Sequence, residues 1–249
     1  MKKFKFNNTF LITLLTFFTL FSCNKDDDTN QEEEPQQASC LINTIYNNYG
    51  VLIHEFTYDE SAKIIKAIAG GNTLNYTYSG NSIIIEEETP SGKFAGKATY
   101  LLNAKGFVTY VHAEHNEAGT NWSDNHYVYE NDSLLVKYIG TNSTGSQPFV
   151  QTYTWQNGNI IASETGTGKI TTYTYYLDMP KKYGGYYSYI NLISGGAKII
   201  ENKNELKSVS QDGITITYSY QTDDDGKIMV MMQNYGTTAI SISYGYQCD

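Results

Sequence analysis

The 249 residues suit one domain of ordinary size, or one elongated repeat array, and argue against two large domains. Tyr (23 residues) and Gly (21) are abundant, Pro (4) is scarce, and Thr, Ser and Asn are frequent, a composition typical of strands and turns. All 17 basic residues are lysine and the net charge is −9, which argues against a nucleic-acid partner.

Residues 1–22 have the layout of a secretory signal peptide: a basic start, an apolar run and then Ser22. The run is too short for the ~20 residues with which a helix spans a bilayer. Leu20 to Cys23 resemble the lipobox of bacterial lipoproteins, in which the signal peptide is cut before a lipid-modified cysteine. We expect Cys23 to carry the lipid. The alternative is an ordinary signal peptide that leaves Cys23 as a free thiol.

Residues 23–39 are expected to form a lipidated, disordered tether. Positions 24–39 hold six acids, one lysine and no large apolar side chain, so this stretch cannot bury enough surface to fold. Lys25 and the three aspartates after it resemble the export signal that sends Bacteroidota lipoproteins to the outer face of the outer membrane. The resemblance implies a lipid anchor in the outer membrane and exposure at the cell surface.

Residues 40–249 repeat one pattern and are expected to form a single domain. An aromatic-x-aromatic triplet precedes a polar turn, and a β-branched run follows, at a spacing of roughly 20 to 27 residues. Asn, Asp and Gly in the turns tolerate the positive φ angles that hairpins need. Copies of the pattern include FTYDESAKII (56–65), YTYSGNSIII (76–85), YVYENDSLLV (127–136), YTWQNGNII (153–161) and YSYQTDDDGKIMV (218–230).

The pattern predicts an all-β fold with little helix. Alternation along a strand places both aromatic residues of each triplet on one face. We therefore predict a long antiparallel β-meander of Tyr-rich hairpins, folded as a curved or twisted open sheet. Residues 59–70 also fit a helix capped by Asp59 and Gly70, but alignment with the other copies favours a strand.

The hairpin signature resembles the Tyr-Asp repeats (YD or RHS-like) of bacterial surface and toxin-encasing proteins. Tyr58-Asp59 keeps the Tyr-Asp pair, and the other copies replace the aspartate. The whole layout, from lipobox through tether to hairpins, is similar to Bacteroidota surface lipoproteins of domain-of-unknown-function families. This resemblance implies a hairpin fold and a surface location, and it carries over no catalytic residue.

Cys40 and Cys248 bracket the expected domain. An even pair of cysteines in an exported protein favours a disulfide, which would tie the two ends of the sheet together. The alternatives are two free thiols or pairing with another chain.

Motifs for catalysis or for a metal or cofactor are weak. His112 and Glu114 would share one face of a strand and His115 the other, which is too few ligands for zinc. QTDDDGKI (221–228) lacks the spacing of a calcium loop, and TGTGK (165–169) lacks the first Gly of a phosphate-binding loop. We predict no catalytic residue, metal or cofactor. The alternative is a catalytic pair of carboxylates that only the fold brings together.

Most aromatic residues are expected to pack within the sheet, and a few are candidates for binding. Trp122 lies in a polar stretch (117–125) that is typical of a loop. Rings with a polar edge suit stacking on sugars or a protein interface. Ser133, in the triplet DSL, resembles a Bacteroidota O-glycosylation acceptor. Four tyrosines beside the pair Gly184-Gly185 complete the candidates: Tyr183, Tyr186, Tyr187 and Tyr189.

Three classes of function follow. The leading hypothesis is a non-enzymatic binding module at the cell surface whose ligand is a glycan or another envelope protein. The alternative is a structural scaffold or accessory subunit of an outer-membrane complex that uses its sheet edges for contact. The least favoured class is a hydrolase with unrecognised carboxylates.

Overall fold

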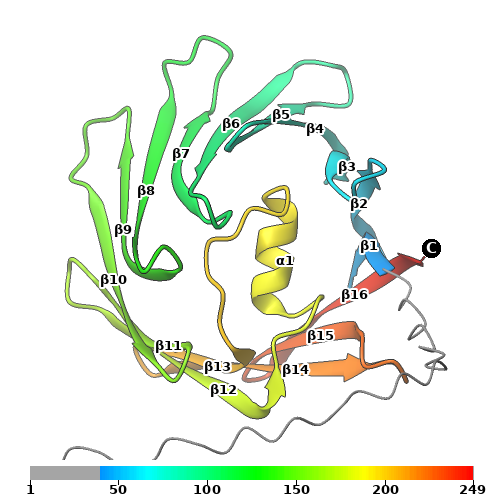
Figure 1. The fold of residues 1–249 in the computed structure, drawn as a ribbon, viewed down its shortest axis with the longest axis vertical. Coiled ribbons are helices and arrows are strands. Elements are labelled where there is room, and N and C mark those ends of the chain that lie inside the picture. The colour runs from blue at the N-terminus through cyan, green and yellow to red at the C-terminus, as the bar shows by residue number, and fades with distance from the viewer. Residues whose placement is uncertain (1–39, 249) are drawn as a thin grey trace, which may run out of the picture. The chain divides into compact units, whose positions relative to one another are not determined.

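The computed structural model describes residues 40–248, which form a closed barrel of 16 antiparallel strands with one helix inside it (Figure 1). The predictions for the signal peptide, for Cys23 and for the tether lie outside the described residues. The elements are β1 Cys40–Asn47, β2 Leu52–Tyr58, β3 Ile64–Ala69, β4 Asn72–Ser79, β5 Ser82–Glu88, β6 Phe94–Leu102, β7 Val108–Glu114, β8 Trp122–Glu130, β9 Leu134–Asn142, β10 Phe149–Gln156, β11 Asn159–Thr165, β12 Ile170–Pro180, α1 Tyr186–Ile193, β13 Asn204–Gln211, β14 Ile214–Thr222, β15 Ile228–Tyr235 and β16 Thr238–Cys248.

The prediction of an open sheet is wrong. Each strand pairs with its neighbours in sequence, as a meander requires, but β1 also pairs with β16, from Cys40 opposite Cys248 to Asn47 opposite Ile242. Closure gives every strand two partners and removes the exposed edges at which sheets aggregate. The all-β class and the antiparallel meander order agree with the sequence prediction.

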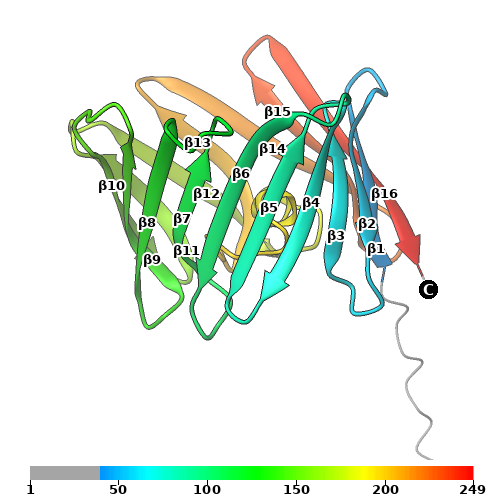
Figure 2. The ribbon, with the colours of Figure 1, turned by 90° about the horizontal axis from the view of Figure 1, so that it is seen from above.

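A disulfide joins Cys40 to Cys248 across the β1–β16 seam. The two cysteines are separated by 208 residues in sequence and lie opposite each other in the ladder. Cys40 begins β1 and Cys248 ends β16, so both lie at one rim of the barrel, which we call the Cys40 rim. Figure 2 shows both ends of the described chain at this rim.

Short turns fix the register of the hairpins. At residues 59–63 the Asp59 carboxylate accepts hydrogen bonds from the backbone N–H groups of Ser61 and Lys63. A strand follows at β3, so the alternative of a helix over 59–70 is wrong. The stretches TGTGK and DDDGK form turns of the same kind, closed by hydrogen bonds from Gly168 N to Thr165 O and from Gly226 N to Asp223 O.

The wall of the barrel is apolar and aromatic inside and polar outside. On β4, Tyr76 is buried in the core whereas Asn75 and Thr77 are exposed. Exposed aliphatic side chains also occur along the strands, among them Ile65, Leu101, Val128, Ile170 and Leu177. Several exposed positions beside inward tyrosines are threonines, namely Thr152 and Thr154 on β10, Thr172 and Thr174 on β12, and Thr217 on β14.

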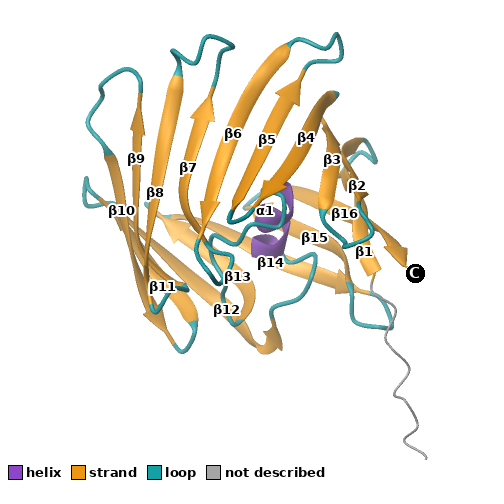
Figure 3. Cartoon of the chain, turned by 45° about the horizontal axis from the view of Figure 1, so that its top comes forward, coloured by secondary structure: helices purple, strands orange, loops and turns teal. Residues whose placement is uncertain are grey.

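The connection between β12 and β13 (residues 181–203) folds into the lumen. We call this segment the plug. It leaves and rejoins the wall at one point, where Lys181 N donates to Lys203 O at 3.0 Å. Figure 3 shows its helix, α1, inside the ring of strands. Among the described residues, no helix has the length and apolar character needed to cross a membrane.

Candidate functional site

A buried carboxylate holds the entry of the plug. The Glu205 side chain, 2% exposed, accepts a hydrogen bond from Lys182 N at 2.5 Å. A Cβ at Gly185, the N-cap of α1, would collide with both Glu205 carboxylate oxygens. Burial raises the pKa of Glu205, and the Lys182 N–H together with nearby lysine charges opposes the rise without cancelling it.

Asparagines hold the exit of the plug. Asn159 Nδ2 donates to Asn204 Oδ1 at 3.0 Å, and Asn204 N donates back to Asn159 Oδ1 at 3.0 Å. Asn202 Oδ1 accepts a hydrogen bond from Ile160 N at 2.8 Å. These buried amides satisfy backbone groups where the plug rejoins the wall, so the plug base is fixed by paired polar contacts.

Inward tyrosines hold the tip of the plug. Tyr129 OH donates to Ile199 O at 3.1 Å, and Tyr78 OH shares its proton between Gly195 O at 3.1 Å and Ile64 O on β3 at 2.9 Å. The backbone of Lys198 also bridges to that of Phe107 beside the β6–β7 turn. The repeated aromatic triplets therefore form the inner wall and bind the plug backbone. This confirms that most aromatic residues have a packing role.

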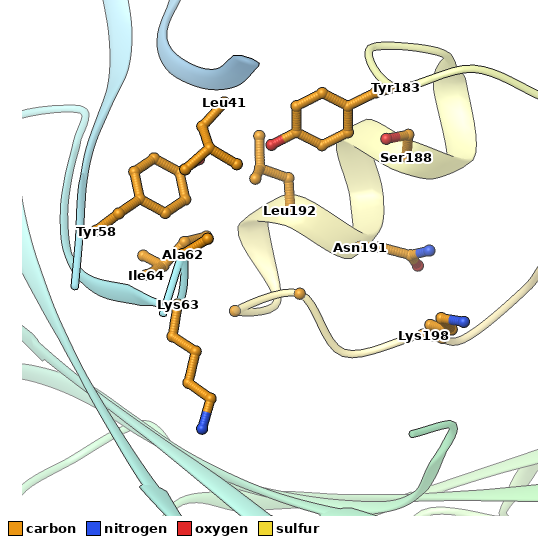
Figure 4. A pocket seen from close by; sticks show the side chains of 12 residues that line it. Leu41, Tyr58, Ala62, Lys63, Ile64, Tyr183, Ser188, Asn191, Leu192 and Lys198 are labelled. Carbon is orange, nitrogen blue, oxygen red and sulfur yellow. The ribbon is translucent and has the colours of Figure 1, made fainter. Parts of the chain in front are cut away.

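A pocket of about 460 Å³ opens between the plug and the Cys40 rim (Figure 4). Figure 4 shows Leu41, Ile64 and Leu192 gathered on one side of the pocket, with Lys63 and Lys198 apart from them on two flanks. Its aromatic members are Tyr58, whose OH donates to Ile42 O at 2.5 Å, and Tyr183. A cavity that combines apolar side chains with a few polar groups is typical of a site for a small molecule.

A second cluster lies on the outer wall, on β7 and β8. Three cross-strand pairs share this face, because they alternate with the core residue Val111: Tyr110 with His126, His112 with Asp124, and Glu114 with Trp122. We call these six residues the wall patch. Glu114 ends β7 and Trp122 begins β8, so this end of the patch lies near the rim opposite the Cys40 rim.

Hydrogen bonds order the wall patch around Asp124. Its Oδ1 accepts from Tyr110 OH at 2.7 Å and pairs with His112 Nδ1 at 2.6 Å. Partial burial alone would raise the pKa of Asp124, but the bonds from Tyr110 and His112 outweigh it and lower the pKa below its ordinary value. Burial and the bond to Asp124 raise the pKa of Tyr110 to about 12. The Trp122 ring is half-buried, with its centroid 6.2 Å from that of His112.

The candidate residues lie in four separate places: the outer wall, the pocket, the lumen and the β8–β9 turn. Trp122 begins β8 and is not in a loop, which corrects the sequence expectation. Tyr183, 38% exposed, lines the pocket. Tyr187 is buried, and the Tyr186 ring packs in the lumen 5.0 Å from that of Tyr218. Tyr189 contacts His54 edge-on inside the barrel, and Ser133 lies in the β8–β9 turn at the Cys40 rim.

Sequence reasoning placed His112 and Glu114 on one face, and the structure confirms it, with His112 Nε2 3.7 Å from Glu114 Oε1. Sequence reasoning did not find Asp124, because its contacts depend on the register of the β7–β8 hairpin. It did not find Lys63 either, because the pocket beside Lys63 depends on a plug in the lumen. Within residues 40–248, no group of three or more His, Cys, Asp or Glu could hold a metal ion. The absence of a cofactor and of catalysis stays a prediction.

No family model matches this chain, and no curated protein matches its sequence. Solved structures that resemble it in fold include two porin-like proteins. A porin-like protein from Bacteroides uniformis ATCC 8492 is 16% identical, with a TM-score of 0.57, over 83% of this chain and 98% of that one. A porin-like protein from Bacteroides vulgatus ATCC 8482 is 13% identical, with a TM-score of 0.56 over the same shares. At this identity the likeness shows the barrel fold, and the Tyr-Asp repeat kinship stays a prediction.

Proposed function

We propose that this chain is a non-enzymatic binding module at the outer membrane, with its barrel outside the bilayer. The observation that supports this is the polarity of the wall. A membrane-spanning barrel carries an apolar band about 25 Å tall on its outside, flanked by aromatic girdles. Here the tyrosines of β4 face the lumen, and Asn75, Thr77 and Ser79 are exposed on the outside of that strand.

The description of two similar structures as porin-like supports an outer-membrane setting. A pore is not favoured for this chain, because the plug lies in the lumen and is bonded at base and tip. The lipid expected on Cys23 supplies an anchor that needs no insertion of the barrel. We propose both the lipid anchor on Cys23 and exposure of the barrel at the cell surface.

We assign a glycan as the ligand of the wall patch. The Trp122 ring offers a flat apolar face, and Asp124, Glu114 and His112 beside it offer hydrogen-bonding groups for sugar hydroxyls. The patch reaches the rim opposite the Cys40 rim. A scaffold that pairs through sheet edges has less support, because the closed barrel has no free edge.

The position of the barrel is tested with a Cys23→Ser variant, which removes the lipid attachment site. We expect this variant to be monodisperse in buffer without detergent and to produce no conductance in planar bilayers. A requirement for detergent, or reproducible channel conductance, would show that the barrel itself enters the membrane.

Glycan binding is tested on a microarray of bacterial and host polysaccharides, followed by titration of the best ligand. Trp122→Ala removes the stacking face and should weaken binding at least tenfold, since one aromatic contact of ~1.5 kcal/mol corresponds to about that factor. Asp124→Asn should weaken it less. The control is Tyr49→Ala, which removes a ring that is 83% exposed in the β1–β2 turn. Equal losses of glycan affinity in Trp122→Ala and in the control would contradict the assignment. If crosslinking in intact cells instead yields one stoichiometric envelope protein, an envelope partner is favoured over a glycan.

A further inference from the structure

The pocket at the Cys40 rim has a lysine without a carboxylate partner. None of the ion pairs in residues 40–248 includes Lys63, whose amine lies 5.3 Å from the centre of the Tyr78 ring. The nearby Asp59 carboxylate accepts its hydrogen bonds from backbone N–H groups of the same turn. The Lys63 amine makes no ion pair with this carboxylate, and Lys63 is one of the two charged residues that line the pocket.

The second lysine of the pocket is only partly neutralised. Lys198 Nζ lies 3.4 Å from Glu201 Oε2, but Glu201 also pairs with Lys181. The Glu201 carboxylate thus pairs with two lysines of the plug. Together with Lys63, the pocket has more positive than negative charge at its polar side, while Leu41, Ile64 and Leu192 line its apolar side.

We propose that this pocket binds a small amphipathic anion, an apolar chain or ring that carries one carboxylate. The apolar part occupies the side lined by Leu41 and Leu192, and the carboxylate pairs with Lys63. The volume of about 460 Å³ falls in the range of about 300–1,000 Å³ that is usual for small-molecule sites. A sugar fits this pocket poorly, because its hydroxyls would lose water against aliphatic side chains.

This site is separate from the glycan site proposed above. The wall patch lies on the outside of β7 and β8, whereas the pocket lies between the β2–β3 turn and the plug. Trp122→Ala should therefore leave the affinity of the pocket unchanged, so the two proposals fail independently.

The test is isothermal titration calorimetry of the lipid-free Cys23→Ser chain with octanoate, octanol and octylamine. The three probes share one chain length and differ in the charge of the head. We expect octanoate to bind about tenfold more tightly than octanol, since a charge-assisted hydrogen bond contributes about 1.5 kcal/mol, and octylamine to bind most weakly. Equal affinity for octanoate and octanol, or no heat with any probe at millimolar concentration, would overturn the proposal.

Variants locate the site. Lys63→Gln keeps the aliphatic stem and removes the charge, so it should weaken octanoate about fivefold or more and leave octanol unchanged. Lys66→Gln, on an exposed position of β3, is the matched control. Leu192→Trp and, from the rim turn, Ala62→Phe fill the pocket from two sides and should each block both probes. Circular dichroism checks that each variant folds, and undiminished octanoate binding in a folded Lys63→Gln or Ala62→Phe protein would contradict the assignment.

Discussion

Gly185 is required because the Glu205 carboxylate occupies the space that a Cβ would need. We expect Gly185→Ala to destabilise the barrel by about 2–3 kcal/mol, as other insertions into a packed interior do. Gly166→Ala is the control, since its Cβ would meet Val150 at 3.7 Å, an ordinary contact distance. Urea denaturation measures both, and an unchanged midpoint for Gly185→Ala would mean that the plug entry adjusts freely.

The raised pKa of Glu205 gives a second residue-scale prediction. Because the folded state holds the proton more tightly than the unfolded state, stability should fall as pH rises from the ordinary glutamate pKa of about 4.3 to the raised one. Glu205→Gln removes this dependence and still accepts the Lys182 N–H. The variant should gain stability relative to the parent between pH 4 and neutrality, measured by urea denaturation. Glu164→Gln, on an exposed position of β11, should show no such trend.

Single residues show how far sequence reasoning reaches. The turn at Asp59 was predictable, since its side chain bonds to backbone two and four residues ahead. The contacts of Trp122 and Asp124 were not predictable, because they depend on which residue of β7 faces which residue of β8. A shift of one residue would turn every side chain of the pair to the other face.

At the scale of elements, α1 is the feature that local sequence describes least well. Its residues, YYSYINLI, are rich in tyrosine and isoleucine, which favour strands, and Gly185 provides no side-chain cap. The surrounding barrel supplies apolar contacts, and a helix satisfies its own backbone hydrogen bonds within them. The tertiary setting therefore determines this helix.

The asparagine pair should control how firmly the plug is held. Asn204→Ala removes the side-chain bond from Asn159 Nδ2 and the bonds that Asn204 Nδ2 donates to Leu177 O and Met179 O, and it leaves these buried partners unpaired, at about 1–3 kcal/mol each. We expect faster hydrogen exchange across α1 relative to β5, followed by mass spectrometry. Asn75→Ala, exposed on β4, should leave the exchange of α1 unchanged. Uniform acceleration over the whole chain would instead indicate global destabilisation.

At the scale of the whole molecule, closure is what the hairpin pattern did not predict. Each hairpin is local, but the β1–β16 ladder joins segments about 200 residues apart, and apart from Cys40 and Cys248 neither strand carries a sign of its partner. The cysteine pair is the sequence feature from which closure of the barrel could have been predicted. A disulfide between the first and last strands of a meander brings its two edges together, and such a sheet closes.

The seam disulfide should matter greatly for stability. In the chain-entropy model, a crosslink that closes a loop of this length contributes about 5 kcal/mol. The double variant Cys40→Ser with Cys248→Ser should lower the urea midpoint strongly, and dithiothreitol should lower that of the parent protein by a similar amount. A midpoint that is insensitive to both treatments would show that the β1–β16 ladder suffices for closure.

The seam also determines how the barrel bears mechanical load. Tension transmitted through the residues before Cys40 enters the barrel at the first residue of β1. In an open sheet that strand would be an edge, and the pull would peel it away one hydrogen bond at a time. Here the covalent link passes the force directly to β16, so two strands share it from the first residue. An oxidised barrel under shear should therefore resist unzipping from its N-terminal end, and a reduced one should yield there first.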